Sequence, residues 1–184
     1  EGKKIILVGH RGHQEVKGTT GQGEMELMDD QEDPQPPDWD ADTEVAVLTQ
    51  TTLSVDDTAA MVDRISSKFR NVTIRNDICY ATTNRQSAVK ELATMVKVVL
   101  VVGSQTSSNC RRLREVAERA GVPAYLINGP DELDMAWFDG VSRVGVSSGA
   151  STPESLVQAV CDALEPDEVK HLGLASEDIE FTLP

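Results

Sequence analysis

The chain has 184 residues, of which 39% are hydrophobic and 26% are charged, so its composition is that of a globular protein and not of a wholly disordered one. A formal charge of −14 argues against nucleic acid and anionic membranes as partners, because both require a basic surface. No apolar run approaches the roughly 20 residues that span a bilayer, and the first residues lack the apolar stretch of a signal peptide, so we expect a cytoplasmic protein.

Short β-branched segments alternate with segments of helical spacing along the chain. Strands are predicted at Lys4–Gly9, Val45–Thr49, Val98–Gly103, Ala124–Ile127 and Val144–Ser147. Helices are predicted from near Val55 behind Ser54, from near Thr83 to Met95, around Leu113 up to Gly121, and from Pro153 to Leu164. This alternation is typical of an α/β fold with mainly parallel sheets.

Negative charge is concentrated in one segment. Ten carboxylates, three prolines and no Lys or Arg lie in residues 24–44, whose middle we interpret as a solvated surface loop without direct chemistry. The rest of the chain has 21 acidic and 17 basic residues, so an anion site is still possible there.

A change in composition near residues 76–77 divides the chain. We predict two similar small α/β domains, at 1–76 and 77–165, followed by a tail at 166–184 whose Ile179 and Phe181 pack back as an edge strand. Because the first predicted strand begins only a few residues into the chain, we expect this sequence to be the later part of a longer protein.

Polar side chains gather where predicted strands end, which is where open α/β sheets bind ligands. His13 and Glu15 follow the first strand; such a pair can bind an anion and transfer a proton, or simply belong to a glycine-rich turn. Thr51 lies in the run Thr49–Asp57, which is rich in hydroxyls; there Ser54 and Asp57 also have the spacing of a helix cap.

The three cysteines, Cys79, Cys110 and Cys161, have no paired short spacing, which argues against a disulfide framework or a zinc knuckle. Cys79 precedes a predicted helix, a position that favours a thiolate nucleophile or metal ligand, although a buried inert thiol is the commoner case.

Two loops in the second half are candidates for anion binding. Residues 103–109 and 146–153 each connect an apolar strand to a helix, so their hydroxyls and free backbone N–H groups can bind phosphate or diphosphate. Helix capping explains one hydroxyl at each loop, but not the three consecutive polar residues Ser107, Ser108 and Asn109.

Five motifs in chain order resemble the 4-hydroxy-3-methylbut-2-enyl diphosphate reductase family. They are Gly9-His-x-Gly-His-x-Glu15-x-x-Gly-Thr-x-Gly-Gln22, Thr49-Gln-Thr-Thr-Leu-Ser-Val-Asp-Asp-Thr58, Asp77-Ile-Cys-Tyr-Ala-Thr-x-Asn-Arg-Gln86, Val101-Val-Gly-Ser-x-x-Ser-Ser-Asn109 and Gly149-Ala-Ser-x-Pro153. The resemblance implies three similar α/β domains with pseudo-threefold symmetry around a [4Fe-4S] cluster, of which this chain would supply the last two.

The resemblance also implies roles for single residues. Cys79 would be a cluster ligand, Glu15 would supply protons and Thr51 would hydrogen-bond the substrate hydroxyl. The diphosphate would be bound by His13, Ser107, Ser108, Asn109 and Ser151. The products would be isopentenyl and dimethylallyl diphosphate, with ferredoxin or flavodoxin as electron donor.

This sequence departs from the family in one respect. Two further ligand cysteines and two histidines of the diphosphate pocket belong to the family's first domain, and neither Cys110 nor Cys161 matches a ligand position. We therefore expect the 184-residue chain alone to be inactive. A non-catalytic diphosphate-binding module of the same fold is the alternative.

Overall fold

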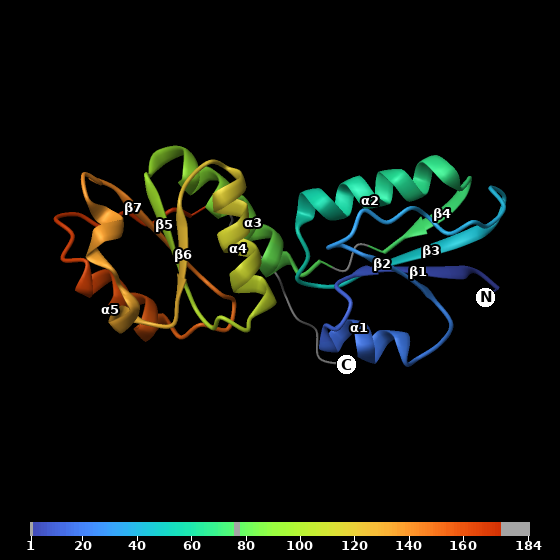
Figure 1. Cartoon of the computed structure of the whole chain (residues 1–184), viewed down its shortest axis with the longest axis horizontal. Coiled ribbons are helices and arrows are strands. Elements are labelled where there is room, and N and C mark those ends of the chain that lie inside the picture. The colour runs from blue at the N-terminus through green and yellow to red at the C-terminus, as the bar shows by residue number, and fades with distance from the viewer. Residues whose placement is uncertain (1, 76–77, 174–184) are drawn as a thin grey trace. The chain divides into compact units, whose positions relative to one another are not determined.

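The structure, a computed structural model, describes residues 2–75 and 78–173. Contacts divide the chain into two compact units, Glu1–Thr82 and Thr83–Pro184, which we call the amino-terminal and carboxyl-terminal units (Figure 1). The predicted boundary at 76–77 and the tail strand predicted around Ile179 and Phe181 lie outside the described residues.

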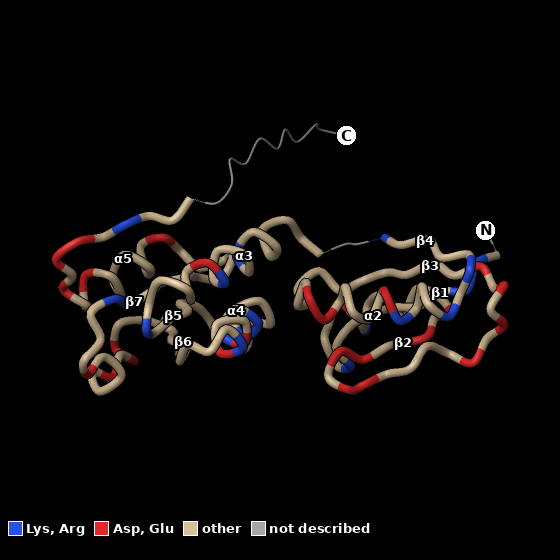
Figure 2. The backbone as a smooth tube through the Cα atoms, turned by 90° about the horizontal axis from the view of Figure 1, so that it is seen from above, with Lys and Arg blue, Asp and Glu red and all other residues tan. Residues whose placement is uncertain are grey.

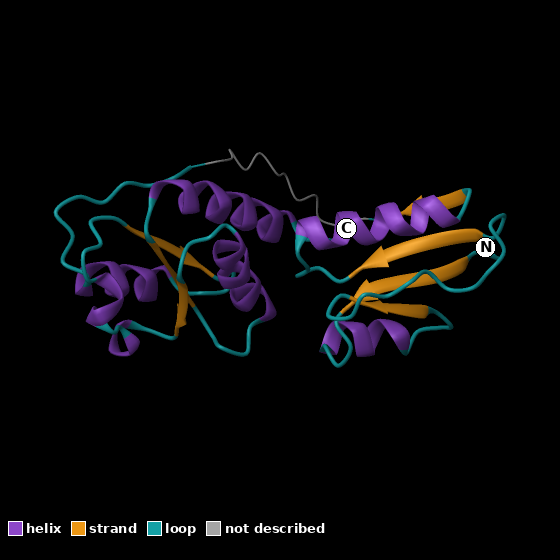
Figure 3. Cartoon of the chain, turned by 45° about the horizontal axis from the view of Figure 1, so that its top comes forward, coloured by secondary structure: helices purple, strands orange, loops and turns teal. Residues whose placement is uncertain are grey.

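The amino-terminal unit contains a four-stranded sheet. Its strands are β1 (Lys4–Gly9), β2 (Glu26–Asp29), β3 (Glu44–Thr49) and β4 (Asn71–Ile74), all parallel, in the order β2-β1-β3-β4. Helix α2 (Val55–Lys68) covers one face of the sheet and the short α1 (Gln14–Thr20) lies on the other (Figure 3).

Alternate residues of the central strands form the core of this unit. Ile6 and Val8 of β1 and Val45 and Val47 of β3 are fully buried in one cluster with Ile65 of α2. The α2 helix begins at Val55, as predicted, behind the N-cap Ser54, whose hydroxyl oxygen accepts a hydrogen bond from the Asp57 N–H at 3.2 Å.

The carboxyl-terminal unit contains a three-stranded parallel sheet. Its strands are β5 (Val98–Val102), β6 (Ala124–Ile127) and β7 (Val144–Ser148), in the order β6-β5-β7. The helices are α3 (Tyr80–Met95), which starts in the other unit, α4 (Ser108–Arg119) and α5 (Glu154–Ala163), with two short 3₁₀ helices at Pro130–Glu132 and Met135–Phe138.

Strand β5 is apolar on both faces, as its unbroken valine and leucine sequence predicts. Val99 and Val101 belong to the core cluster that includes α3 and α4, whereas Val98, Leu100 and Val102 belong to the cluster that includes α5. The predicted class, an α/β fold with parallel sheets, is confirmed.

The acidic segment has an irregular middle, as predicted, but its first part forms β2. Figure 2 shows its carboxylates along the stretch that leads from β2 to β3. Ion pairs connect it to the end of α2: Arg64 with Asp33 at 2.6 Å and Lys68 with Asp38 at 3.6 Å. Trp39 packs against Phe69, with ring centroids 6.0 Å apart, so this loop is anchored to the unit.

The start of α3 differs from the prediction. The helix begins at Tyr80, directly after Cys79, and not near Thr83. Tyr and Thr are weak helix formers, which explains why the sequence pattern places the start one turn late. None of the described helices is both long and apolar enough to cross a bilayer.

Candidate functional site

The turn after β1 is closely attached to the loop after β3. A Cβ at Gly9 would lie 2.6 Å from Val16 Cγ2, so only glycine lets α1 approach the strand this closely. Gln50, which is 2% exposed, joins the two loops: its Oε1 accepts from the His10 N–H at 2.9 Å and its Nε2 donates to Thr52 Oγ1 at 2.9 Å. The spacing between the loops is thereby set.

Glu15 and Thr51 are in direct contact across these loops. The carboxylate of Glu15 accepts the Thr51 N–H at its Oε1 (2.9 Å) and the Thr51 hydroxyl at its Oε2 (2.8 Å). Hydrogen bonds to a carboxylate are stronger than those between neutral groups, and two of them fix both its position and its plane. Both residues are half-buried, so the pair is ordered and still accessible.

His13 is the N-cap of α1. Its Nδ1 accepts a hydrogen bond from the Glu15 N–H at 3.3 Å. A neutral imidazole that accepts at Nδ1 carries its proton on Nε2. The cap therefore leaves His13 with an N–H donor suited to an anion.

Cys79 is connected to the same network through the backbone. Its N–H donates to the Thr51 carbonyl at 3.2 Å, and its own carbonyl accepts from the Thr82 N–H at 2.8 Å in the first turn of α3. The residue is exposed. One residue, Thr51, thus contacts both the proposed proton donor and the backbone of the proposed metal ligand.

A pocket of about 240 Å³ adjoins Glu15 on the α1 side of the sheet. It is lined by Leu7, Glu15, Val16, Thr19, Leu48, Thr49 and Gln50. Small-molecule sites usually measure about 300–1,000 Å³, so this space accommodates only a small group.

In the carboxyl-terminal unit, the N-terminus of α4 carries the predicted anion-binding residues. The Ser107 hydroxyl caps the helix by accepting the Cys110 N–H at 3.3 Å, and Ser108 is the first helical residue. Asn109 is only 7% exposed, yet neither its Nδ2 nor its Oδ1 has a hydrogen-bond partner among the described residues. A buried amide without protein partners costs free energy, so both of its polar atoms are available to hydrogen-bond a ligand.

The loop after β7 adjoins this helix end. The Gly149 N–H and the Thr152 hydroxyl both donate to the Val102 carbonyl, at 3.1 and 3.0 Å, which ties the loop to the end of β5. A Cβ at Gly149 would lie 2.4 Å from Cys110 Sγ and 4.0 Å from Asn109 Nδ2. Ser151 lies exposed in this loop, two residues beyond Gly149.

The predicted site residues therefore form one group within each unit. His13, Glu15, Thr51 and Cys79 lie at the carboxyl edge of the four-stranded sheet. Ser107, Ser108, Asn109 and Ser151 lie at the carboxyl edge of the three-stranded one. Sequence reasoning missed Gln50, because an amide among three threonines gives no distinct signal until its burial is known.

The three thiols have different surroundings. Cys110 is 2% exposed and its Sγ fits against Gly103 and Gly149. Burial, with the nearby Asp162 and Glu154 carboxylates, raises the pKa of the Cys161 thiol. Of the three, only Cys79 is exposed, so it is the accessible soft ligand of this chain.

A family model, curated relatives and a solved structure match this chain. Residues 1–165 match the model of a family described as LytB protein. Curated relatives from Acinetobacter baylyi and Azotobacter vinelandii, both named 4-hydroxy-3-methylbut-2-enyl diphosphate reductase, are 46% and 48% identical over 195 residues, covering 100% of this chain and 62% of theirs. A solved structure, the E-1-hydroxy-2-methyl-but-2-enyl-4-diphosphate reductase from Plasmodium falciparum, is similar with a TM-score of 0.86 and 31% identity, covering 100% of this chain and 60% of its own.

Proposed function

Because the chain belongs to the LytB protein family, we propose that it forms part of a reductase acting on (E)-4-hydroxy-3-methylbut-2-enyl diphosphate. The products are isopentenyl and dimethylallyl diphosphate, in the last step of the non-mevalonate isoprenoid pathway. The chain spans 62% of the length of the curated relatives named above. We propose that it corresponds to the second and third domains of the family's three, with the first also required for activity.

The observation that carries this function is the hydrogen-bonded group Glu15–Thr51–Cys79. Three residues assigned separately to proton supply, hydroxyl binding and metal binding lie 36 and 28 positions apart and are linked by three hydrogen bonds. Folding alone does not require a carboxylate, a hydroxyl and an exposed thiol to lie together at a sheet edge.

The chemistry requires a controlled proton supply. Replacing the allylic hydroxyl by hydrogen consumes two electrons and two protons and releases one water. When Glu15 is protonated, its O–H can donate to Thr51 Oγ1, and the Thr51 hydroxyl can then donate to the departing substrate oxygen, because a hydroxyl both donates and accepts. The Thr51 N–H on Oε1 holds the carboxyl group in plane for this transfer.

Cys79 is suited to be one ligand of an iron–sulfur cluster. Clusters of the [4Fe-4S] type are held by Cys thiolates, and Cys79 is an exposed thiol at a helix start. A bound cluster would supply the electrons, received from ferredoxin or flavodoxin, and an iron that polarises the hydroxyl oxygen. Cys79 would hold that group near Thr51, and the Thr51 hydroxyl would orient the substrate hydroxyl.

Diphosphate binding is assigned to donors that the fold leaves available. Asn109 supplies a buried amide without protein partners, and Ser108 supplies a hydroxyl and a backbone N–H at the start of the twelve-residue α4. Ser151 supplies a further hydroxyl in the loop beside α4, and His13 offers Nε2–H to the same class of anion. Ser107 contributes to the diphosphate site indirectly, because its hydroxyl caps α4 and fixes the position of the helix N-terminus.

The test is Glu15→Gln in the complete protein, reconstituted anaerobically with iron and sulfide. The amide keeps the shape but cannot deliver a proton, so kcat should fall by about 10²–10⁴ while the cluster absorbance is unchanged. The control is Glu24→Gln, an exposed residue of the same unit with the same charge change. Turnover within twofold of the parent would refute the role of Glu15, and substrate binding without turnover in the parent would instead support the non-catalytic module.

A further inference from the structure

A second cluster of ligating side chains lies at the same sheet edge, on the opposite side of β1 from β3. In the parallel pairing of β1 with β2, Gly9 is opposite Asp29. The next residues, His10 and Asp30, therefore leave the sheet side by side. The register alone brings one imidazole and two carboxylates together, at a position for which the five family motifs assign no role.

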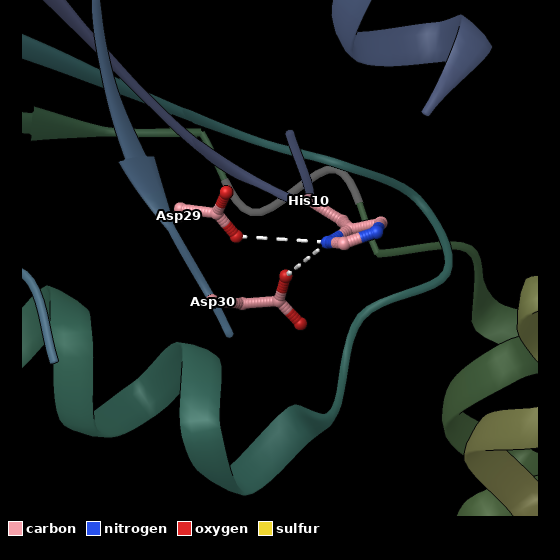
Figure 4. A group of neighbouring side chains, drawn as sticks. All are labelled: His10, Asp29 and Asp30. Carbon is pink, nitrogen blue, oxygen red and sulfur yellow. Dashed lines mark ion pairs between the residues drawn. The ribbon is translucent and has the colours of Figure 1, made fainter. Parts of the chain in front are cut away.

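The three side chains point toward one another (Figure 4). Nδ1 of His10 lies 3.6 Å from Asp29 Oδ1 and 3.8 Å from Asp30 Oδ1, and one ligand atom from each residue lies within 4.8 Å of the others. The Asp29 and Asp30 side chains are only 5% and 3% exposed. Two carboxylates are thus removed from water beside each other, and a positive charge between them would offset their mutual repulsion.

The imidazole does not act as an ordinary hydrogen-bonded partner here. Both distances exceed the roughly 3.2 Å limit for an N–H···O bond, and His10 Nδ1 is a buried atom with no hydrogen-bond partner among the described residues. Its second ring nitrogen points away from the carboxylates (Figure 4). An imidazole whose proton is on Nε2 would offer the Nδ1 lone pair to an ion between the three residues.

Backbone N–H groups hold the Asp29 carboxylate in the orientation that binding an ion would require. Its Oδ2 accepts the Arg11 N–H at 3.1 Å and lies 3.5 Å from Arg11 Nε. Its Oδ1 accepts the Gln31 N–H at 3.1 Å and faces His10. Groups that hydrogen-bond a ligating carboxylate in this way fix its direction in known metal sites.

We propose that His10, Asp29 and Asp30 bind one divalent transition-metal ion, with zinc as the best fit. Zinc binds imidazole and carboxylate at about 2.1 Å, which puts neighbouring tetrahedral ligand atoms roughly 3.4 Å apart. The observed 3.6 and 3.8 Å require only small side-chain movements. The ion's charge would add to that of Arg11 beside Asp29 in offsetting the two carboxylates, and water would complete the coordination.

This ion has a structural role. It joins β2 to the turn that leads into α1, and α1 carries His13 and Glu15. Its nitrogen and oxygen donors distinguish it from a thiolate site.

The experiment is a calorimetric titration of the 184-residue chain with Zn²⁺, in a Cys79→Ser background that removes the accessible thiolate. We expect one ion per chain, and at least about tenfold weaker binding in Asp30→Asn and in His10→Gln. Asp33→Asn, with the same loss of charge three residues farther along at an exposed side chain, should bind as the parent does.

Two further readouts separate metal binding from effects on folding. Zn²⁺ should raise the Tm of the parent and of Asp33→Asn but not of folded Asp30→Asn, because a ligand of the native state stabilises it. Nitrogen-15 NMR should show the His10 Nδ1 resonance, and not that of Nε2, changing with Zn²⁺. Absence of one-to-one binding, equal affinity in all variants, or an imidazolium doubly protonated at neutral pH and unaffected by Zn²⁺ would each overturn the site.

Discussion

At the scale of single residues, Thr51 makes contacts through its backbone as well as through its hydroxyl. Its N–H and Oγ1 both bind the Glu15 carboxylate, while its carbonyl binds the Cys79 N–H. The two backbone contacts survive any side-chain replacement, so a substitution here removes only the hydroxyl and leaves the loop attached.

Thr51→Val should therefore isolate the contribution of that hydroxyl. A hydrogen bond to a charged group contributes about 1.5–3 kcal/mol, so kcat of the complete enzyme should fall by roughly 10–100-fold with the cluster retained. Thr51→Ser keeps the hydroxyl and should stay close to the parent. Steady-state kinetics on both variants would measure the contribution of the hydroxyl to kcat. Equal activity of the Val and Ser forms would show that the hydroxyl is not used.

The three thiols should react with iodoacetamide in a fixed order. Cys79 is exposed, Cys161 is partly buried with a raised pKa, and Cys110 is 2% exposed. A raised pKa lowers the thiolate fraction at neutral pH, so Cys161 should react more slowly than Cys79 and respond at higher pH than an ordinary thiol. Mass spectrometry of timed samples from the folded chain would measure this; labelling of Cys110 first would contradict the packing around it.

At the scale of the elements, two glycines allow the loops after β5 and β7 to close around one sulfur. A Cβ at Gly103 or Gly149 would come within 2.5 or 2.4 Å of Cys110 Sγ, and Gly103 has a φ of 151°. The start of α4, with Asn109, is thereby held against both loops. A larger residue must displace either the sulfur or a loop.

Gly149→Ala should lower the free energy of unfolding by about 1–3 kcal/mol through overpacking, as measured by urea denaturation. Gly173→Ala, where nothing lies within 4 Å of the added methyl group, should have little effect. Cys110→Ala in the Gly149→Ala background should recover part of the loss, because it removes the clashing atom. Additive losses in the double variant would rule out the clash as the cause.

Periodicity predicts the buried elements well and the others poorly. Strands such as β5 and helices such as α2 carry their own apolar pattern and were predicted nearly to the residue. The edge strand β4 is largely exposed, so no pattern distinguishes it from a loop. Helix α1 includes Gly18 and two threonines, which are poor helix formers, and it forms where Val16 is buried against Gly9.

The site was predictable as residue types but not as contacts. Motif resemblance indicates Glu15 and Thr51 separately, yet their hydrogen bonds depend on β1 and β3 being neighbours, which spacing does not reveal. The cluster at His10 depends in the same way on the pairing of β1 with β2, an element hidden in the acidic segment. Sheet order is a property of the whole chain's packing and not of local sequence.

At the scale of the whole molecule, the number of accessible thiols limits what this chain can bind. A stable [4Fe-4S] cluster needs three or four Cys thiolates, and here Cys110 is buried while Cys161 is partly buried on α5. We expect anaerobic reconstitution of the 184-residue chain with iron and sulfide to give neither a stable cubane nor turnover.

The measurement is the visible absorbance and iron content after gel filtration, compared with Cys79→Ser. Parent and variant should retain equally little iron. A stable cluster with activity in the parent chain would show that the first domain of the family is not required.

The anchoring of the acidic loop has a practical consequence. The chain has two tryptophans: Trp39 lies against Phe69 in the amino-terminal unit, and Trp137 is stacked on Tyr125, with centroids 3.9 Å apart, in the carboxyl-terminal unit. Each unit thus has one tryptophan in contact with another aromatic ring. Unfolding of that unit would break this contact and change the tryptophan fluorescence. Trp39→Phe and Trp137→Phe each leave a single tryptophan, so with tryptophan-selective excitation the cooperativity between the two halves of the polypeptide can be followed optically without any added dye.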